Sequence, residues 1–190
     1  MADWPFRGLE TPRLKLRRLA PDDAEAYLAI FSEPEVMRYW SREPITTLDE
    51  ARDLVARDLE WVASGEALCW GIALPDTDRV IGKVSLYLFD AQSRRAETGY
   101  VLGRPWWRRG LMSEALAAVL RYAFDDLELH RIEADVDPEH AASLALLSKF
   151  GFRREGLFRD RWHVHGQWHD SVMLGLLAPE YTGPTEPESR

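Results

Sequence analysis

Three arginines and a glycine lie close together near the middle of this chain. Arg104, Arg108 and Arg109 fall within six residues, and Gly110 follows them directly. The clearest helical pattern of the chain begins after this glycine, so the backbone N–H groups of residues 108–113 are the unpaired donors of a helix N-terminus. Such a terminus carries about half a positive charge and favours anions. The pattern predicts either a binding site for a diphosphate-sized anion or a loop with solvated arginines.

The common nucleotide-binding loops are absent. The chain contains neither G-x-G-x-x-G nor G-x-x-x-x-G-K-[ST], so the dinucleotide and P-loop readings lose their main support.

Composition narrows the class of protein further. The 190 residues carry 24 Lys and Arg against 32 Asp and Glu, a net charge of −8, which argues against a nucleic-acid partner. No apolar run reaches the roughly 18 residues of a membrane span, and the first residues do not resemble a signal peptide. We therefore expect a soluble cytoplasmic protein without a membrane partner. The single cysteine, Cys69, excludes an intramolecular disulfide and a thiolate-rich zinc site, and we expect it to be a buried core residue.

Hydrophobic periodicity indicates the elements that position these residues. Strands are predicted at 14–19, 68–74, 80–89, 97–102, 131–136, 152–162 and 168–177. Helices are predicted at 21–31, 48–64, 111–127 and 138–150, and the second begins with the capping-box spacing of Thr47 and Glu50. We expect one α/β (α+β) domain over residues 11–178, preceded by a lead-in at 1–10 and followed by a disordered tail at 179–190.

The segment from Trp107 to Ala115 (W-R-R-G-L-M-S-E-A) resembles the acetyl-CoA pyrophosphate loop of the GNAT superfamily of N-acyltransferases. The resemblance is strongest to the RimJ/RimL type, the ribosomal-protein N-terminal acetyltransferases. It extends from about residue 11 to 177 and also rests on the segments 96–100, 129–133, 138–143, 149–152, 155–156 and 166–170. The resemblance implies the GNAT fold, a mixed and mostly antiparallel sheet of about seven strands with flanking helices, and acetyl-CoA as co-substrate without a metal.

The resemblance also implies which residues bind the co-substrate. Met112 replaces the usual small residue of the loop, so its side chain must point away from the pyrophosphate. His140 stands where the RimJ/RimL type commonly has an asparagine that contacts the pantetheine arm. The backbone N–H of Leu102 is the expected donor to the thioester carbonyl. The co-substrate contacts implied are Leu102, Arg108, Arg109, Gly110, Leu111, Met112, Ser113 and His140.

Acyl transfer from a thioester to an amine requires a base for the amine and a proton for the leaving thiolate. At pH 7, deprotonation costs roughly 1.4 kcal/mol for an α-amine of pKa about 8 and roughly 4.6 kcal/mol for a lysine of pKa about 10.4. Glu97, on the strand before the loop, is the candidate base; the alternative is an ion pair with Arg94 or Arg95. Ser143 is the candidate acid or thiolate partner by resemblance; the alternative is an ordinary serine in the first turn of a helix.

Candidates for the acceptor site lie at two places in the chain. Tyr39 and Trp40, between the first two predicted helices, contact the acceptor or else belong to the core or its rim. Asp170 attracts a cationic amine or else anchors a turn. The histidines of the last hairpin, His163, His165 and His169, suggest a metal site, but a place in the wall of the acceptor cleft is favoured.

Taken together, these residues predict an acetyl-CoA-dependent N-acetyltransferase that acts on a primary amine, by direct attack in a ternary complex. The acceptor is a protein N-terminal α-amine or a small-molecule amine, and the protein is a monomer or homodimer. Two alternatives remain open at this point. One is transfer of another acyl group, such as succinyl; the other is a CoA-binding sensor domain without turnover.

Overall fold

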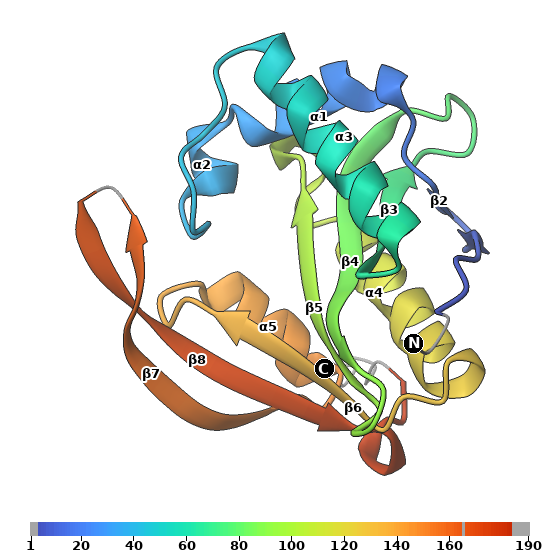
Figure 1. Ribbon diagram of the computed structural model, residues 1–190, viewed down its shortest axis with the longest axis vertical. Coiled ribbons are helices and arrows are strands. Elements are labelled where there is room, and N and C mark those ends of the chain that lie inside the picture. The colour runs from blue at the N-terminus through green and yellow to red at the C-terminus, as the bar shows by residue number, and fades with distance from the viewer. Residues whose placement is uncertain (1–3, 165, 184–190) are drawn as a thin grey trace, which may run out of the picture.

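A computed structural model describes residues 4–164 and 166–183 of the chain (Figure 1). The strands are β1 (Leu9–Glu10), β2 (Lys15–Arg17), β3 (Ala67–Ala73), β4 (Val80–Asp90), β5 (Arg95–Leu102), β6 (Arg131–Val136), β7 (Arg153–Val164) and β8 (Gln167–Leu177). The α-helices are α1 (Ala24–Phe31), α2 (Pro34–Met37), α3 (Leu48–Ser64), α4 (Leu111–Arg121) and α5 (Ala141–Lys149).

The strands form one sheet in the order β1-β2-β3-β4-β5-β6-β8-β7, in which every neighbouring pair is antiparallel except β5 and β6. Helices α1 to α3 lie against one face of the sheet, and α4 and α5 lie against the other (Figure 1). The predicted α/β fold with a mostly antiparallel sheet is confirmed. The sheet has eight strands rather than about seven, because the two residues of β1 pair with β2 at its edge.

The helix boundaries follow from local sequence. The Thr47 side chain accepts the N–H of Glu50, and the Glu50 carboxylate accepts the N–H of Thr47, so the predicted capping box starts α3. Gly65 ends the helix with a left-handed φ of 77°. The predicted helix over 111–127 is α only to Arg121 and finishes as a wider π-type turn at residues 122–126.

Two hydrophobic clusters hold the layers together. One joins α4 and α5 to the sheet through side chains such as Trp70, Leu116 and Ile132; the other joins α1 to α3 to the opposite face through Tyr27 and Phe31. Cys69 is buried as predicted, and burial raises the pKa of its thiol to about 12, so it is not a nucleophile at neutral pH.

The strands β5 and β6 separate along their length, and this separation opens the sheet. They pair in parallel only from Arg95–Glu97 to Arg131–Glu133. Beyond Glu97, β5 stays paired with β4 as far as Leu102, whereas β6 stays paired with β8 as far as Val136. The side of β5 that faces β6 therefore has no strand partner over residues 98–102.

Parts of the expected lead-in and tail pack on the domain. The Trp4 ring stacks on Phe89 at a centroid distance of 4.8 Å, and the Phe6 ring stacks on Trp70 at 5.5 Å. After a 3-10 turn at Ala178–Glu180, the Tyr181 hydroxyl donates to the Ala117 carbonyl at 3.3 Å. The last seven residues, 184–190, lie outside the described residues. Among the helices that are described, none is long and apolar enough to cross a membrane.

Candidate active site

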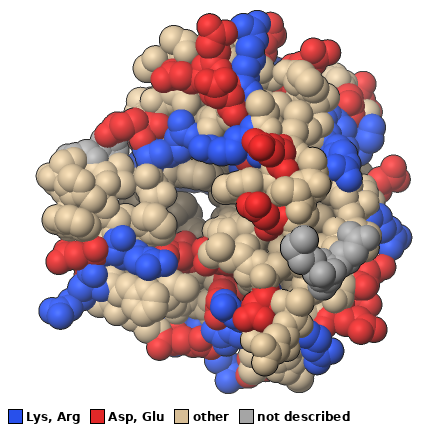
Figure 2. Space-filling model, viewed as in Figure 1, with Lys and Arg blue, Asp and Glu red and all other residues tan. Residues whose placement is uncertain are grey.

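A cavity of about 280 Å³ lies where β5 and β6 separate. Figure 2 shows it as an opening that passes through the molecule, with Lys and Arg side chains on two sides of it. Its walls come from the loop after α2, from the strands β4 to β6, from the start of α5 and from the β7–β8 hairpin. The cavity brings together six of the predicted site residues: Tyr39, Trp40, Glu97, His140, Ser143 and Asp170.

Glu97 is a partly buried carboxylate in this cavity. The Tyr87 hydroxyl donates to its Oε1 at 2.7 Å, and no described residue donates to its Oε2. Burial raises the pKa of Glu97 above its usual value; the charges of Asp135 and Glu133 add to the rise, whereas the Tyr87 hydrogen bond and Arg161 oppose it. A raised pKa suits a general base.

The alternative ion pair for Glu97 is not found among the described residues. Arg95 instead lies 2.8 Å from Glu133 and 3.6 Å from Asp90. The Glu97 carboxylate is therefore not neutralised by an arginine of its own strand.

Ser143 and Tyr100 form a hydroxyl pair on the other side of the cavity. Their oxygens lie 2.8 Å apart, and either one can donate. Ser143 is in the first turn of α5 and is buried, and burial raises the pKa of Tyr100 to about 12. Both hydroxyls are therefore protonated at neutral pH and able to pass a proton.

The carboxylate and the hydroxyl pair lie on opposite faces of the sheet. Ser143 belongs to α5, and α5 packs on the same face as α4. Glu97 is bound by Tyr87 of β4. Tyr87, Ser85 and Lys83 alternate along β4 and therefore point to the same face of the sheet. That face is the one covered by α1 to α3, because Lys83 binds Asp58 of α3. The gap between β5 and β6 connects the two faces.

The two predicted acceptor aromatics contact different neighbours. The Tyr39 ring stacks on His140 at a centroid distance of 4.4 Å, so the loop after α2 touches the start of α5 across the cavity. Burial lowers the pKa of His140, which keeps its imidazole neutral at pH 7. Trp40 packs edge-on against Phe31 at 5.5 Å, so it is both a rim residue of the core and part of the cavity wall.

The hairpin residues have structural partners. The Asp170 carboxylate accepts the backbone N–H of Asp160 at 2.9 Å, which supports the anchoring role among the two considered for it. His163 packs against Trp168 at a centroid distance of 4.7 Å, and His169 lies 3.9 Å from Asp137. His165 lies outside the described residues. Within the described parts of the chain, no group of three or more His, Cys, Asp or Glu side chains is placed to hold a metal ion.

A second hollow, of about 440 Å³, lies along α4 from Gly110 to Arg121, between this helix and residues 10–13. Gly110 precedes the helix with a φ of 74°, a left-handed value that favours glycine, and no side chain caps the helix. The glycine loop before α4 is fastened by Arg13, which binds Glu114 through its Nε at 2.6 Å and donates to the Arg109 carbonyl at 3.0 Å. The first N–H groups of α4 are thus held in place without a side-chain acceptor.

The remaining predicted loop residues differ in their surroundings. Met112 packs against the core, so its side chain points away from the loop surface, as required. Leu111 is buried, and the Ser113 hydroxyl accepts from Lys149 at 3.3 Å. Arg108 is exposed with a φ of 60°, and the Arg109 guanidinium lies over the Trp106 ring.

Leu102 lies at the end of β5 and does not line the cavity. Its carbonyl accepts the Trp107 indole N–H at 2.6 Å, and the next N–H, that of Gly103, donates to Ile81 on β4. Because backbone groups alternate along a strand, the Leu102 N–H faces the side from which β6 has separated. That orientation is the one its predicted role requires.

Several cavity residues were not predicted as site residues from the sequence, among them Arg38, Tyr87, Tyr100, Asp135 and Arg161. The alternation of β4 places Lys83, Ser85 and Tyr87 on one face, which gives a weak signal for Tyr87. Arg161 gives no such signal, because it reaches the cavity only through an irregularity of β7 that periodicity does not reveal.

Comparison with known proteins agrees with this geometry. The model of the acetyltransferase (GNAT) domain family matches residues 13–153. The N-acetyltransferase p20 of Bacillus licheniformis is 39% identical over 175 residues, which cover 92% of this chain and 98% of p20. The [ribosomal protein uS5]-alanine N-acetyltransferase of Escherichia coli is 36% identical over 124 residues, 65% of this chain and 64% of that protein.

A solved structure shows the same fold. Mycobacterium smegmatis RimJ in complex with CoA-disulfide superposes with a TM-score of 0.78 at 26% identity, and the match covers 90% of this chain and 85% of RimJ. The chain belongs to the GNAT family of acetyltransferases, and enzymes of the RimJ type are among the proteins that it resembles.

Proposed function

We propose that this enzyme transfers an acetyl group from acetyl-CoA to a primary amine, by direct attack of the amine on the thioester while both are bound. One observation carries the proposal. A carboxylate of raised pKa, Glu97, and a hydroxyl pair, Tyr100 and Ser143, line one cavity from opposite faces of the sheet. This arrangement supports a base for the attacking amine and a proton source for the leaving sulfur in one cavity.

The glycine loop supports CoA as the donor. The N–H groups at the start of α4 have no side-chain cap, and Gly110 leaves the backbone accessible. Arg108 and Arg109 add positive charge, and Met112 is turned into the core. A CoA diphosphate fits such a set of donors. The CoA-disulfide named for the M. smegmatis RimJ structure is consistent with this assignment.

In the proposed reaction, the amine nitrogen bonds to the acyl carbon as the carbon–sulfur bond breaks. Acetyl-CoA supplies the activated acyl group. Glu97 takes the proton of the amine, directly or through one water, and the Tyr100–Ser143 pair gives a proton to the departing sulfur. The Leu102 N–H is proposed to meet the negative charge that develops on the acyl oxygen. Overall, the reaction transfers one proton from the amine to the CoA thiol.

The name of the E. coli relative points to a peptide amine as acceptor, an alanine at the start of a ribosomal protein. We propose an N-terminal α-amine for this enzyme too. The lower pKa of an α-amine demands less of Glu97 as a base, since deprotonation of an α-amine at pH 7 costs about 3 kcal/mol less than that of a lysine side chain.

The test is an assay of purified enzyme with acetyl-CoA and a set of peptides and small amines, in which free thiol and product mass are followed together. We expect both to appear in equal amounts. Glu97→Gln should lower turnover by 10²-fold or more, the range of general-base catalysis, and most at pH values where the amine is protonated. An unchanged pH–rate profile in this variant removes Glu97 from the role of base.

The donor site is tested separately by acetyl-CoA affinity. Gly110→Asp places a negative charge and a strained φ at the start of α4, so acetyl-CoA should bind at least tenfold more weakly. Gly65→Asp is a matched control, because Gly65 has a similar φ of 77° at the end of α3, with no atom within 4 Å of the added Cβ. Equal affinity in the Gly110 variant and the wild type would place the CoA site elsewhere.

A further inference from the structure

The strand β7 contains a bulge beside the cavity. Phe158 pairs with Ser171 and Trp162 pairs with His169, so Arg159, Asp160 and Arg161 oppose the single residue Asp170. Asp160 has a left-handed φ of 50°, and its N–H donates to the Asp170 carboxylate at 2.9 Å. The bulge is therefore a fixed feature with its own anchor.

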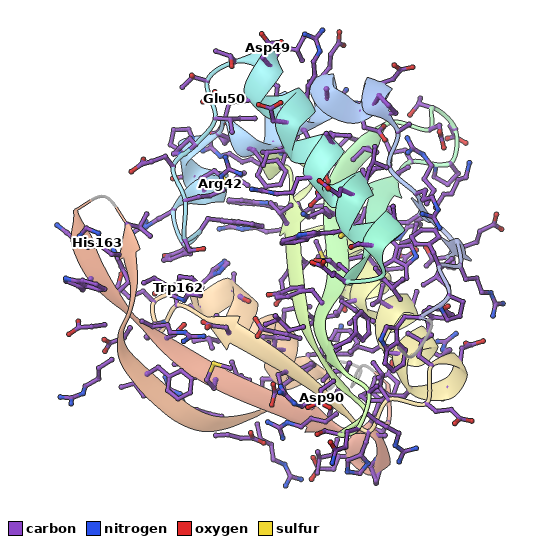
Figure 3. All side chains as sticks on the ribbon, viewed as in Figure 1. Arg42, Asp49, Glu50, Asp90, Trp162 and His163 are labelled. Atoms are coloured by element: carbon purple, nitrogen blue, oxygen red, sulfur yellow. The ribbon has the colours of Figure 1, made fainter. Side chains whose placement is uncertain are left out.

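A second aspartate holds the end of the bulge against β6. Asp135 accepts the Ser171 hydroxyl, and its carboxylate lies 3.5 Å from both the Arg161 Nε and the Trp162 indole nitrogen. Its side chain is only 10% exposed. Figure 3 places Trp162 in the space between the hairpin and the rest of the domain. Arg161 and Trp162 thus form a wall of the cavity.

Two guanidinium groups of the cavity have free N–H donors. Among the described residues, Arg161 makes no hydrogen bond; it has the ion-pair contact with Asp135 and lies over the Phe158 and Trp162 rings at 5.5 and 5.3 Å. Arg38, from the loop after α2, has neither a hydrogen bond nor an acidic partner within the described chain and lies over the Tyr39 ring at 5.3 Å. Both arginines are exposed.

The aspartates of the cavity each have a partner. Asp135 accepts from Ser171 and Trp162 and has the ion-pair contact with Arg161, Asp170 accepts the Asp160 N–H, and Asp137 accepts the N–H of Glu139 at 2.7 Å. Among the described residues, Glu97 Oε2 and Asp170 Oδ2 have no donor, and Asp137 Oδ2 has only the His169 ring nitrogen at 3.9 Å. A ligand in the cavity therefore meets two guanidinium groups with free N–H donors as well as open carboxylate oxygens, so an amine and an anionic group can both find partners there.

Arg161 lies on the acceptor side, and Arg38 follows α2, whose Val36 and Met37 pack in the cluster of α1 to α3. Ile132, Ala134 and Val136 of β6 pack in the core with α4 and α5, so Asp135 projects from the opposite face, and Arg161 lies with it. The glycine loop is on the α4 face, where the CoA donor is proposed to bind. A group held by Arg161 therefore belongs to the acceptor rather than to the acyl donor.

We propose that Arg38 and Arg161 select acceptors that carry a carboxylate near the reacting amine, with Asp135 and Asp170 as the residues that position Arg161. This inference rests on the proposed function. Arg38 and Arg161 line the same cavity as Glu97, the proposed base. The carboxylate therefore lies close to the reacting amine, in the first residues of a peptide or on a free amino acid. Paired N–H donors of arginine suit a carboxylate geometrically.

The test compares three C-terminally amidated peptides that begin with alanine and are otherwise identical. Their second and third residues are both Asp, both Gln or both Lys. We expect kcat/KM to be at least tenfold higher for the Asp peptide than for the Lys peptide at 0.05 M salt. Arg161→Gln and Arg38→Gln should each reduce this ratio severalfold, and Arg161→Glu should reverse the preference. Arg159→Gln is the matched control, since Arg159 is on the same bulge but does not line the cavity.

A comparison of alanine with alaninamide, each at the same concentration, shows whether a free α-carboxylate serves as well as an acidic side chain. A higher kcat/KM for alanine than for alaninamide, or for the Asp peptide than for the Lys peptide, supports the inference. Equal kcat/KM for the Asp and Lys peptides, or an equal loss in the Arg159 and Arg161 variants, overturns it. A loss in the Arg161 variant that occurs only with succinyl-CoA, whatever the acceptor, also overturns it and assigns the arginines to the acyl group. Absence of transfer to any amine overturns the proposed function itself.

Discussion

A single hydrogen bond orients Glu97, and a glycine makes room for it. A Cβ at Gly99 would lie 3.2 Å from Cε1 of Tyr87 and 3.3 Å from the Tyr87 hydroxyl. The glycine of the Glu97-Thr98-Gly99-Tyr100 segment therefore lets the Tyr87 ring cross β5 and reach the carboxylate. The sequence shows the glycine but not its partner, because the contact joins residues on two different strands.

Loss of this hydrogen bond should change the pH dependence of the reaction. The Tyr87 bond lowers the pKa of Glu97 against the effects of burial, Asp135 and Glu133, and Arg161 acts in the same direction as Tyr87. In Tyr87→Phe the pKa of Glu97 should rise, so the acidic limb of the kcat/KM profile should move to higher pH. Tyr181→Phe, far from the cavity, should leave the profile unchanged. A profile of Tyr87→Phe that coincides with the wild type contradicts the assignment.

Glu97 should also reduce stability while it serves catalysis. Its folded pKa lies above the ordinary value of 4.5, so the folded state binds the proton more tightly than the unfolded state does. The stability that this proton contributes is present below pH 4.5 and is lost as pH rises through the folded pKa. Glu97→Gln should therefore have a higher Tm than the wild type at pH 8, and the difference should shrink toward pH 4. Thermal melts across this range measure it; a constant difference would contradict the argument.

At the scale of elements, a buried charge cluster ties α3 to the sheet and to α1. The Lys83 ammonium lies 2.8 Å from the Asp58 carboxylate, and the Tyr27 hydroxyl donates to the same carboxylate at 2.7 Å. The Asp58 side chain is 3% exposed. The Asp58 carboxylate thus joins α3, α1 and β4. The loop with Tyr39 and Trp40 runs between α2 and α3, so it is anchored next to this cluster.

Removal of this carboxylate should cost far more than removal of a surface one. Asp58→Ala leaves Lys83 buried without its partner, so we expect a loss of about 3–5 kcal/mol in the free energy of unfolding. Asp49→Ala, in the first turn of the same helix (Figure 3), removes only an exposed pair with Arg52 and should cost about 0–1 kcal/mol. Denaturant unfolding of both variants provides the measurement, and similar losses would refute the role of the cluster.

Periodicity and caps predict the long elements and miss the short ones. The box of Thr47 and Glu50 marks the start of α3 because both bonds are local in sequence. The four residues of α2 and the two of β1 are too short to show a period. The separation of β5 from β6 has no local signal at all, since it depends on which neighbour each strand keeps.

At the scale of the whole molecule, the opening between β5 and β6 connects two faces of one sheet. The proposed donor site at Gly110 is on the α4 face, and the proposed acceptor wall at Arg161 is on the other. The sequence predicted Glu97, Ser143 and His140 for this site, and the fold brings them into one cavity. It did not indicate Tyr100 or Asp135 as partners, because their roles follow from contacts between distant segments.

Separate approaches for donor and acceptor have a kinetic consequence. Both substrates should be bound at once, so double-reciprocal plots of rate against either substrate should intersect, and enzyme mixed with labelled acetyl-CoA alone should retain no covalent label. The buried thiol of Cys69 offers no route to an acyl-enzyme at neutral pH. Parallel lines together with a labelled protein would show a covalent intermediate instead.

The bulge in β7 also affects how the molecule meets other copies of itself. β7 is the last strand of the described sheet, and it exposes Leu157, Phe158 and Trp162. A regular strand in this position would offer an unbroken row of peptide groups for pairing with a strand of another chain, the first step of edge-to-edge aggregation. Because Arg159, Asp160 and Arg161 depart from the ladder and carry charge, that row is broken at its apolar centre. The feature that shapes the acceptor wall therefore also interrupts this edge of the sheet as a template for strand pairing.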